Sequence, residues 1–252
     1  MNIIIKLFLL FVTIFLFTSS FTSVEAVEGF LVWNDWYSFG PKALVQKFRS
    51  AIFRVSTFKC LKEELSAEFV IVLAAYKSND YEFIINRDAE LNINNARAAG
   101  IEDVDIYIAP CLSCEQPSKN IISVLNNLNE INLKFGSVWL SVLGLVNGKN
   151  TAGWFINEKT KNLEFINEMV NTLINLNQTY GIYTDKYDWH EITGNTQKFN
   201  NVSLLYYHND EKNNIDDYNE YGYPFGGWEK PKMKIYSYAT ICEIDIARIW
   251  RP

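Results

Sequence analysis

The sequence predicts an α/β fold in which about eight strands close into one barrel. Runs of Val, Ile and Leu alternate with segments of helical periodicity, and such uniformly apolar strands are typical of a parallel sheet buried on both faces. Eight strands of this kind suit a closed (β/α)8-type barrel. The helical segments become fewer toward the C-terminus, so we expect fewer helices in that half.

The predicted helices and strands can be placed in order along the chain. The clearest helix spans residues 162–176, where Leu163, Ile166 and Val170 recur at helical spacing and Gly181 follows as a stop. Two further helices are predicted at 89–99, closed by Gly100, and at 121–128. The predicted strands are 69–75, 104–109, the strand through Val138, 182–184, 202–208 and 234–238. Residues 30–33 and 44–53 are alternative first strands, and 208–231 reads as a long loop over the site end of the barrel.

The N-terminus has the pattern of a signal peptide over residues 1–26. Lys6 provides a positive charge, residues 7–17 form an apolar core too short to cross a bilayer, and residues 24–26 offer small side chains for cleavage. A membrane anchor is the alternative interpretation. The mature chain, residues 27–252, is then expected to be one domain without a membrane span, secreted or lumenal (extracellular, or phagosomal or lysosomal).

Charge and cysteine content exclude some classes of partner. A formal charge of −6 and a pI near 5.1 argue against nucleic acid as a partner, since nucleic acid needs a basic protein face, and against electrostatic steering to an anionic bacterial wall.

Four cysteines in an exported chain favour two disulfides, with Cys111 and Cys114 as one pair. A redox motif or half a zinc site is the alternative for that Cys-x-x-Cys, but no second Cys/His pair lies near it, so we expect no metal and no cofactor. Sequons at Asn177 and Asn201 would accept N-glycans.

Residues 135–144 form a strand that resembles a glycosidase's catalytic strand without its acids. Residues two apart in a strand share a face and lie about 6.6 Å apart, so Asp-x-Glu here would aim two carboxylates into one site. Such pairs cleave glycosidic bonds. The two positions hold Ser141 and Leu143, which cannot exchange protons in the useful range.

Several motifs in order and spacing resemble the lysozymes of glycoside hydrolase family 25, in a secreted eukaryotic branch, from about Ser56 to the C-terminus. They are residues 56–62, the strand 69–76, residues 95–101 and 104–114, the strand of residues 135–144, residues 180–185 with Trp189, and residues 225–228. The resemblance implies an irregular (β/α)8-type (TIM-like) barrel that hydrolyses the β-1,4 bond between N-acetylmuramic acid and N-acetylglucosamine in peptidoglycan. The implied partner is bacterial cell-wall glycan, and the expected state is a monomer.

The chain departs from that family's pattern at the catalytic positions. The family strand reads aromatic-x-Asp-x-Glu-Gly; here Trp139 and Gly144 keep the frame while Ser141 and Leu143 replace the acids. The family's acid on the first strand aligns with Phe48 or Leu31, and its acid on the last strand with Ala247 or Ile249, with Asp245 close by. We therefore expect weak or lost hydrolysis; the alternative function is non-catalytic glycan binding or interaction on a lysozyme barrel.

Barrel closure also predicts the second disulfide and the groove residues. Cys60 follows the region of the first strand and Cys242 lies near the last, so closure would bring them together. Sites in such barrels lie at the carboxyl ends of the strands. Polar or aromatic residues there are Tyr76, Asp80, Glu115, Tyr183, Asp185, Tyr206, Tyr207, His208 and Asp210. Of these, we expect Tyr76, Tyr183, Asp185, Tyr206, Tyr207 and His208 to contact substrate.

Some aromatic and polar residues of this region could have a role in packing instead of in substrate binding. Tyr206 and Tyr207 could instead pack, one toward the barrel interior and one toward the helices, and core packing is favoured for Trp139, Trp189 and Trp228. Asp185 and Asp210 are candidate substitutes for the missing acid/base pair. Ser141 is expected to be a polar filler of the vacated site, since no His/Asp constellation supports a serine nucleophile.

Overall fold

The computed structural model describes residues 27–32, 52–78, 82–114, 116–146, 149–150, 152–220 and 223–252, and it forms a closed eight-stranded barrel. The predicted signal peptide and most of the rival first strand at 44–53, Phe48 included, lie outside these residues. The barrel strands are β1 (Val27–Val32), β2 (Phe69–Lys77), β4 (Asp103–Ile108), β5 (Val138–Ser141), β8 (Tyr180–Thr184), β9 (Ser203–Tyr207), β10 (Met233–Ile241) and β11 (Ile244–Arg251).

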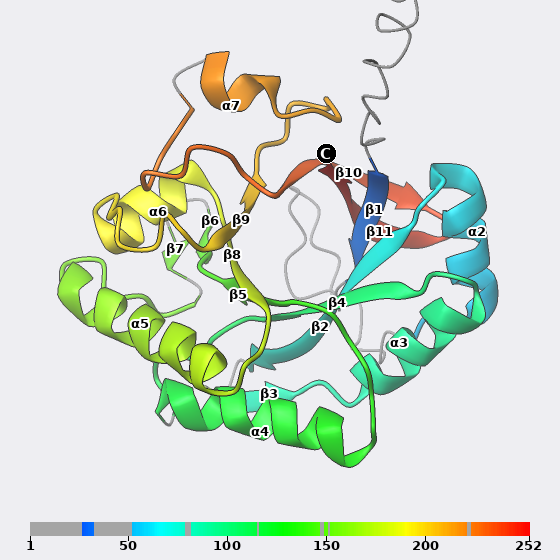
Figure 1. Ribbon diagram of the computed structural model, residues 1–252, viewed down its shortest axis with the longest axis horizontal. Helices are drawn as coiled ribbons and strands as arrows, with labels where there is room; N and C mark the ends of the chain where they lie inside the picture. The colour runs from blue at the N-terminus through cyan, green and yellow to red at the C-terminus, as the bar shows by residue number, and fades with distance from the viewer. Residues whose placement is uncertain are drawn as a thin grey trace, which may run out of the picture.

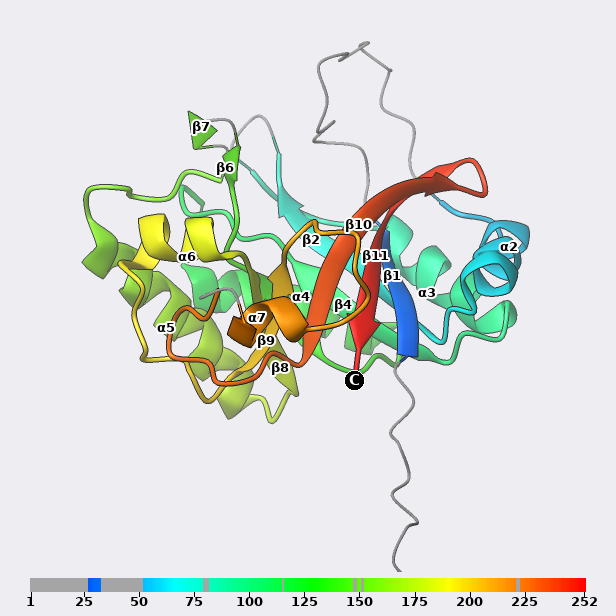
Figure 2. The same ribbon diagram turned by 90° about the horizontal axis from the view of Figure 1, so that it is seen from above.

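Strand pairing closes the barrel between its first and second strands. β1 pairs in parallel with β2 and antiparallel with β11, and β11 is also antiparallel to β10. All other neighbouring barrel strands are parallel. Outside the barrel, short β3 (Phe83–Ile85) pairs with the end of β2, and β6 (Leu145–Val146) pairs with β7 (Lys149–Asn150). The β10–β11 hairpin and the β6–β7 pair rise at the same end of the molecule (Figure 2).

Six helices are present among the described residues, and most of them form a ring around the strands (Figure 1). They are α2 (Val55–Leu65), α3 (Asp88–Ala98), α4 (Pro117–Glu130), α5 (Lys159–Asn175), α6 (Lys186–Thr193) and α7 (Asp216–Glu220). The helices predicted from periodicity correspond to α3, α4 and α5. No described helix is long and apolar enough to cross a membrane.

The strands are apolar on both faces because each face contacts a different core. Leu31, Phe69, Ile71, Trp139 and Leu205 belong to a cluster inside the barrel. Their neighbours along each strand belong to the larger cluster between the strands and the helices, which also buries Trp189 and Trp228. All three tryptophans for which core packing was favoured are at most 3% exposed, so that prediction is confirmed.

Both predicted disulfides are present. Cys60 and Cys242 lie 6.0 Å apart at Cα and join segments 182 residues apart, and Cys111 is bonded to Cys114. Cys60 lies within α2 rather than directly after the first strand, and Cys242 occupies the turn between β10 and β11. The bridge therefore fastens the first described helix to the last hairpin.

Helices α2, after β1, and α6, after β8, were not predicted; the buried side chains of α2 are Phe58 and Leu61. One sequence expectation is corrected by the structure. The predicted loop 208–231 contains α7, a five-residue helix too short to show helical periodicity. The first strand is β1, which agrees with the run at residues 30–33.

Candidate functional site

The carboxyl end of β5 presents Ser141 and Leu143 toward the barrel interior. Trp139, two residues earlier, is inside the barrel; Ser141 is 7% exposed, and Leu143 packs against the interior cluster. The backbone at this strand end is fixed from three sides. Val142 N–H donates to the Tyr183 carbonyl at 2.8 Å, Gly144 N–H donates to Asp188 Oδ2 at 2.7 Å, and Trp154 Nε1 donates to the Leu143 carbonyl at 2.9 Å.

Glycine is required directly after these positions. Gly144 has a φ of +138°, which L side chains rarely adopt, and an added Cβ would lie 2.4 Å from Ala152 Cβ. The glycine therefore fixes the direction in which the chain leaves β5. It also keeps the frame in which positions 141 and 143 face inward.

Four tyrosines from four different strands lie at this end of the barrel interior, and we refer to them as the tyrosine cluster: Tyr107 of β4, Tyr183 of β8, Tyr207 of β9 and Tyr238 of β10. Tyr107 and Tyr183 meet edge to face with ring centroids 6.3 Å apart, and Tyr207 and Tyr238 lie 5.5 Å apart. The Tyr238 hydroxyl is hydrogen-bonded to Tyr183 and Tyr207. Burial raises the pKa of all four hydroxyls, so the cluster is neutral over the usual pH range.

Asp185 follows β8 and sits beside the tyrosine cluster. It is the N-cap of α6, and its carboxylate accepts the Asp188 N–H at 2.7 Å. Burial raises the pKa of Asp185 above its ordinary value, although hydrogen bonds from the backbone of Asp188 and Tyr187 partly offset this. Asp185 and Tyr207 line the same cavity, and the negative charge of Asp185 is a smaller cause than burial of the raised pKa of Tyr183, Tyr207 and Tyr238.

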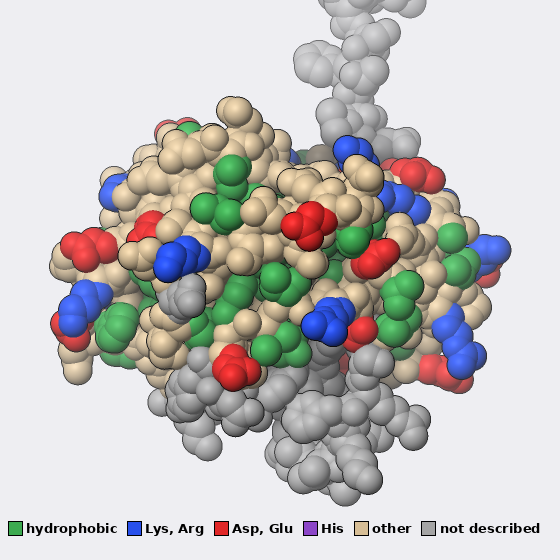
Figure 3. Space-filling view, turned by 90° about the horizontal axis from the view of Figure 1, so that it is seen from below, with side chains coloured by type: hydrophobic (Ala, Val, Ile, Leu, Met, Phe, Trp, Pro, Cys, Tyr) green, Lys and Arg blue, Asp and Glu red, His purple; other side chains and the backbone are tan. Residues whose placement is uncertain are grey.

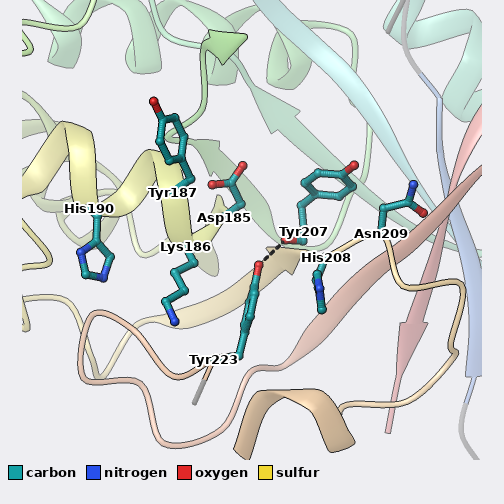
Figure 4. A pocket seen from close by; sticks show the side chains of 8 residues that line it. All are labelled: Asp185, Lys186, Tyr187, His190, Tyr207, His208, Asn209 and Tyr223. Atoms are coloured by element: carbon teal, nitrogen blue, oxygen red, sulfur yellow. Dashed lines mark hydrogen bonds between the residues drawn. The ribbon is translucent and has the colours of Figure 1, made fainter. Parts of the chain in front are cut away.

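A cavity of about 570 Å³ opens outward from Asp185 and Tyr207. Figure 4 shows its lining: α6 lies on one side, and the end of β9 and Tyr223 lie on the other. Tyr187 is 60% exposed at its rim. Tyr223 donates its hydroxyl to the Tyr207 carbonyl at 3.0 Å and stacks on His208 with centroids 4.5 Å apart. The full lining is Asp185, Lys186, Tyr187, His190, Tyr207, His208, Asn209 and Tyr223.

A second polar cluster lies outside the barrel wall, beneath α7. Lys234 of β10 is fully buried, and its ammonium donates to Asp210 at 2.7 Å and to Asp217 at 2.8 Å. Asp217 also accepts the Tyr206 hydroxyl at 2.8 Å, and its Oδ2 lies 2.6 Å from His208 Nδ1. Burial alone would raise the pKa of Asp217, but the hydrogen bonds from Lys234, His208 and Tyr206 outweigh it and lower the pKa.

The acids and histidine of this cluster are close enough to one another to hold a metal ion. One ligand atom from each of His208, Asp210 and Asp217 lies within 4.8 Å of the other two. However, the Lys234 ammonium already bonds both carboxylates. The cation that these acids need is therefore supplied by the chain itself.

The structure separates the two acids considered as a substitute catalytic pair. Asp185 lines the cavity, whereas Asp210 does not line it and is bonded to buried Lys234. Tyr206 is fully buried and faces α7, while Tyr207 faces the interior, so the two tyrosines divide between the faces as strand alternation requires. His208 lines the cavity, and Tyr76 packs half-buried against the interior cluster at the end of β2.

The remaining candidates are placed as follows. Asp80 and Glu115 lie outside the described residues. Leu31, Ala247 and Ile249, candidates for the family's other acid positions, are apolar and inside the barrel, and Asp245 is exposed and bonded to Thr240 at 2.5 Å. Asn177 and Asn201, the glycosylation acceptors, are both exposed.

Seven residues of this region were not among the sequence candidates: Tyr107, Tyr238, Lys186, Tyr187, His190, Asn209 and Tyr223. Tyr107 and Tyr238 lie within predicted strands, and only the strand alternation that places them inside the barrel could have identified them. Tyr223 comes from the predicted loop, and nothing in its local sequence indicates that it folds back onto β9.

Comparison with known proteins agrees with the barrel. A family model described as lysozyme-like protein 1 matches residues 48–236. Lysozyme-like protein 5 of Caenorhabditis elegans is 29% identical over 187 residues, covering 73% of this chain and 80% of that protein. Probable GH family 25 lysozyme 2 of Dictyostelium discoideum is 29% identical over 204 residues, covering 81% and 88%. A family GH25 lysozyme from Aspergillus fumigatus superposes with a TM-score of 0.62 at 15% identity, covering 90% of this chain and 94% of that one.

Proposed function

This chain belongs to the glycoside hydrolase family 25 lysozymes, and we propose that it binds bacterial peptidoglycan in the mouth of its barrel while hydrolysing it weakly or not at all. The family reaction is hydrolysis of the β-1,4 bond between N-acetylmuramic acid and N-acetylglucosamine. The chain would thus bind the same ligand as its family but have lost most of the hydrolytic activity.

The main support for this proposal is that the end of β5 has no carboxylate at positions 141 and 143. Glycosidases of this kind use two carboxyl groups, one as acid and one as base or nucleophile, about 5 to 9.5 Å apart. The inward-facing positions at this strand end hold a serine and a leucine. Loss of such carboxylates costs several kcal/mol of transition-state stabilisation, and each 1.36 kcal/mol is about tenfold in rate.

Asp185 alone does not rebuild the reaction. Its raised pKa suits a general acid, but among the eight residues that line the cavity it is the one carboxyl group. Asp210, the proposed partner, does not line the cavity, and its carboxylate is bonded to the Lys234 ammonium. A second carboxyl at a controlled distance from Asp185 is therefore missing from the described cavity.

Glycan binding is supported by the side chains that remain. Tyr187 and Tyr207 offer aromatic rings for contact with sugars, and Asp185 and Asn209 offer hydrogen-bonding groups. On the face of the molecule that Figure 3 shows, acidic and basic side chains are interspersed. We expect a secreted or lumenal monomer.

The test is incubation of residues 27–252 with purified insoluble peptidoglycan, alongside an active family 25 muramidase. We expect saturable sedimentation with the peptidoglycan and no released muropeptides with reducing N-acetylmuramic acid ends by mass spectrometry. Release of such fragments would show that acids elsewhere perform the reaction. Absence of both binding and release would leave a barrel used for another interaction and would overturn the proposal.

A further inference from the structure

We propose that the barrel mouth binds a sugar with a free amino group, with Asp185 as the counter-ion and the tyrosine cluster around it. The chemical class is an ammonium-bearing amino sugar, such as the glucosamine units of a de-N-acetylated aminoglycan. This inference rests on the proposed function, since it names the kind of glycan that the same site prefers.

The first supporting observation is that Asp185 lacks a cation within the described part of the chain. Its carboxylate accepts backbone N–H groups at the start of α6, and no described Lys or Arg forms an ion pair with it. The neighbouring Lys186 extends away from Asp185 and lies over the Tyr223 ring, 5.4 Å from its centroid (Figure 4). A buried carboxylate is costly without a positive partner, which a ligand can supply.

The second observation is the aromatic environment. The ring faces of tyrosines carry negative potential and attract ammonium groups, and their hydroxyl oxygens accept hydrogen bonds. Tyr187, Tyr207 and Tyr223 line the same cavity as Asp185, and the Tyr238 ring centroid lies 5.5 Å from that of Tyr207. A carboxylate among several tyrosines is a composition suited to an ammonium ion.

An N-acetylated sugar satisfies this environment less well. Its neutral amide N–H can donate one hydrogen bond to Asp185, but the carboxylate charge stays uncompensated. The free amine adds two further donors and a positive charge. Positions 141 and 143 add no competing charge, and the net charge of −6 favours the approach of a cation.

The test compares two oligosaccharides of equal length, one of glucosamine and one of N-acetylglucosamine, by isothermal titration calorimetry at low salt. We expect the full mature chain to bind the glucosamine oligomer at least about tenfold more tightly, and the difference to shrink as salt is added. Binding of the glucosamine oligomer should also weaken as the pH falls through the raised pKa of Asp185, because a proton then replaces the ammonium. Lys186, His190 and His208 line the same cavity, so this pH dependence should be much smaller in Asp185→Asn, which keeps all three side chains. The N-acetylated oligomer, which loses at most one hydrogen bond to Asp185, should also show a smaller dependence.

Asp185→Asn provides the sharpest variant, because asparagine keeps the N-cap of α6 while removing the charge. We expect the preference to fall to about twofold or less. Asp216→Asn is the matched control, since it makes the same change in charge at an exposed position in the first turn of α7. That variant should keep the preference.

The outcomes separate this inference from the proposed function. Equal or tighter binding of the N-acetylated oligomer by the unmodified chain would overturn the inference while leaving glycan binding intact. Persistence of the preference in Asp185→Asn, or its loss in Asp216→Asn, would show that general charge rather than this site selects the amine. Failure to bind either oligomer or peptidoglycan would overturn the proposed function itself.

Discussion

Two aspartates in this molecule have pKa values shifted in opposite directions because their partners differ. Burial raises the pKa of Asp185, and only backbone groups offset it. Asp217 is also buried, but the Lys234 ammonium and the neighbouring His208 and Tyr206 lower its pKa. Because Asp217 already bonds a lysine of the chain, it holds α7 in place. Asp185 forms no ion pair with a described Lys or Arg, so it is the acid that we expect to bind a ligand cation.

The lowered pKa of Asp217 makes an acid-sensitive contribution to stability. This contribution is complete above the ordinary pKa of 3.8 and is lost as the pH falls through the lower value of the folded state. Asp217→Asn should therefore be less stable than the unmodified chain by about 3 kcal/mol at neutral pH, since it breaks a buried pair, although Asp210 remains bonded to Lys234.

Urea denaturation at a series of pH values measures this effect. The gap in unfolding free energy between the two proteins should narrow below about pH 4. The exposed Asp216→Asn variant should follow the unmodified chain throughout. A gap that is constant down to pH 2 would show that the Asp217 carboxylate contributes no charge-dependent stability.

At the scale of elements, the end of β5 is held by its backbone rather than by the side chains at positions 141 and 143. Hydrogen bonds to Tyr183 and Asp188, and from Trp154, fix residues 142–144. Substitutions at the two inward-facing positions should therefore leave the direction of the strand unchanged. The end of β5 is a scaffold on which acids could be placed again.

We expect Ser141→Asp combined with Leu143→Glu to fold without regaining lysis. The residues that the resemblance aligns with the family's remaining acids, Phe48 or Leu31 and Ala247 or Ile249, are all apolar, so the restored pair is expected to lack its supporting carboxylates. Muropeptide release measured by mass spectrometry, with circular dichroism as the control for folding, checks this expectation. Measurable lysis by the double variant would show that the supporting acids come from other positions.

At the scale of the whole molecule, the two disulfides differ in the length of chain that they restrain. Cys60–Cys242 spans 182 residues and joins α2 to the β10–β11 hairpin, whereas Cys111–Cys114 spans 3. A disulfide that closes a longer loop removes more conformational entropy from the unfolded chain. The long bridge therefore fixes α2 against the β10–β11 hairpin at the C-terminal end of the chain.

Replacing both Cys60 and Cys242 with alanine should lower the free energy of unfolding by about 2–5 kcal/mol, as for other native disulfides. Replacing Cys111 and Cys114 should cost less, because the short loop restrains little of the unfolded chain. Guanidinium denaturation of the two double variants and the unmodified chain measures both effects. A larger loss from the short bridge would contradict the entropic explanation.

Local patterns in the sequence were sufficient for most of the barrel strands, for helices α3, α4 and α5 and for the Cys111–Cys114 disulfide, whereas the Cys60–Cys242 disulfide was predicted from barrel closure. Apolar runs predicted the strands because both faces of each strand are buried, and the spacing of Leu163, Ile166 and Val170 predicted α5 because one face of that helix packs on the barrel. The replacement of the family's two acids by Ser141 and Leu143 could also be predicted, because Trp139 and Gly144 fix the alignment of this strand with the family motif.

Only the tertiary structure decided which polar residues meet. Tyrosines from four strands meet inside the barrel, Asp210 is bonded to Lys234, and Tyr223 folds from a loop onto β9. Alternation along a strand gives the face of each residue, but not the neighbours that barrel closure supplies from distant strands. The sequence by itself therefore determined the fold and the missing acids, whereas the composition of the site depended on long-range contacts that no local pattern encodes.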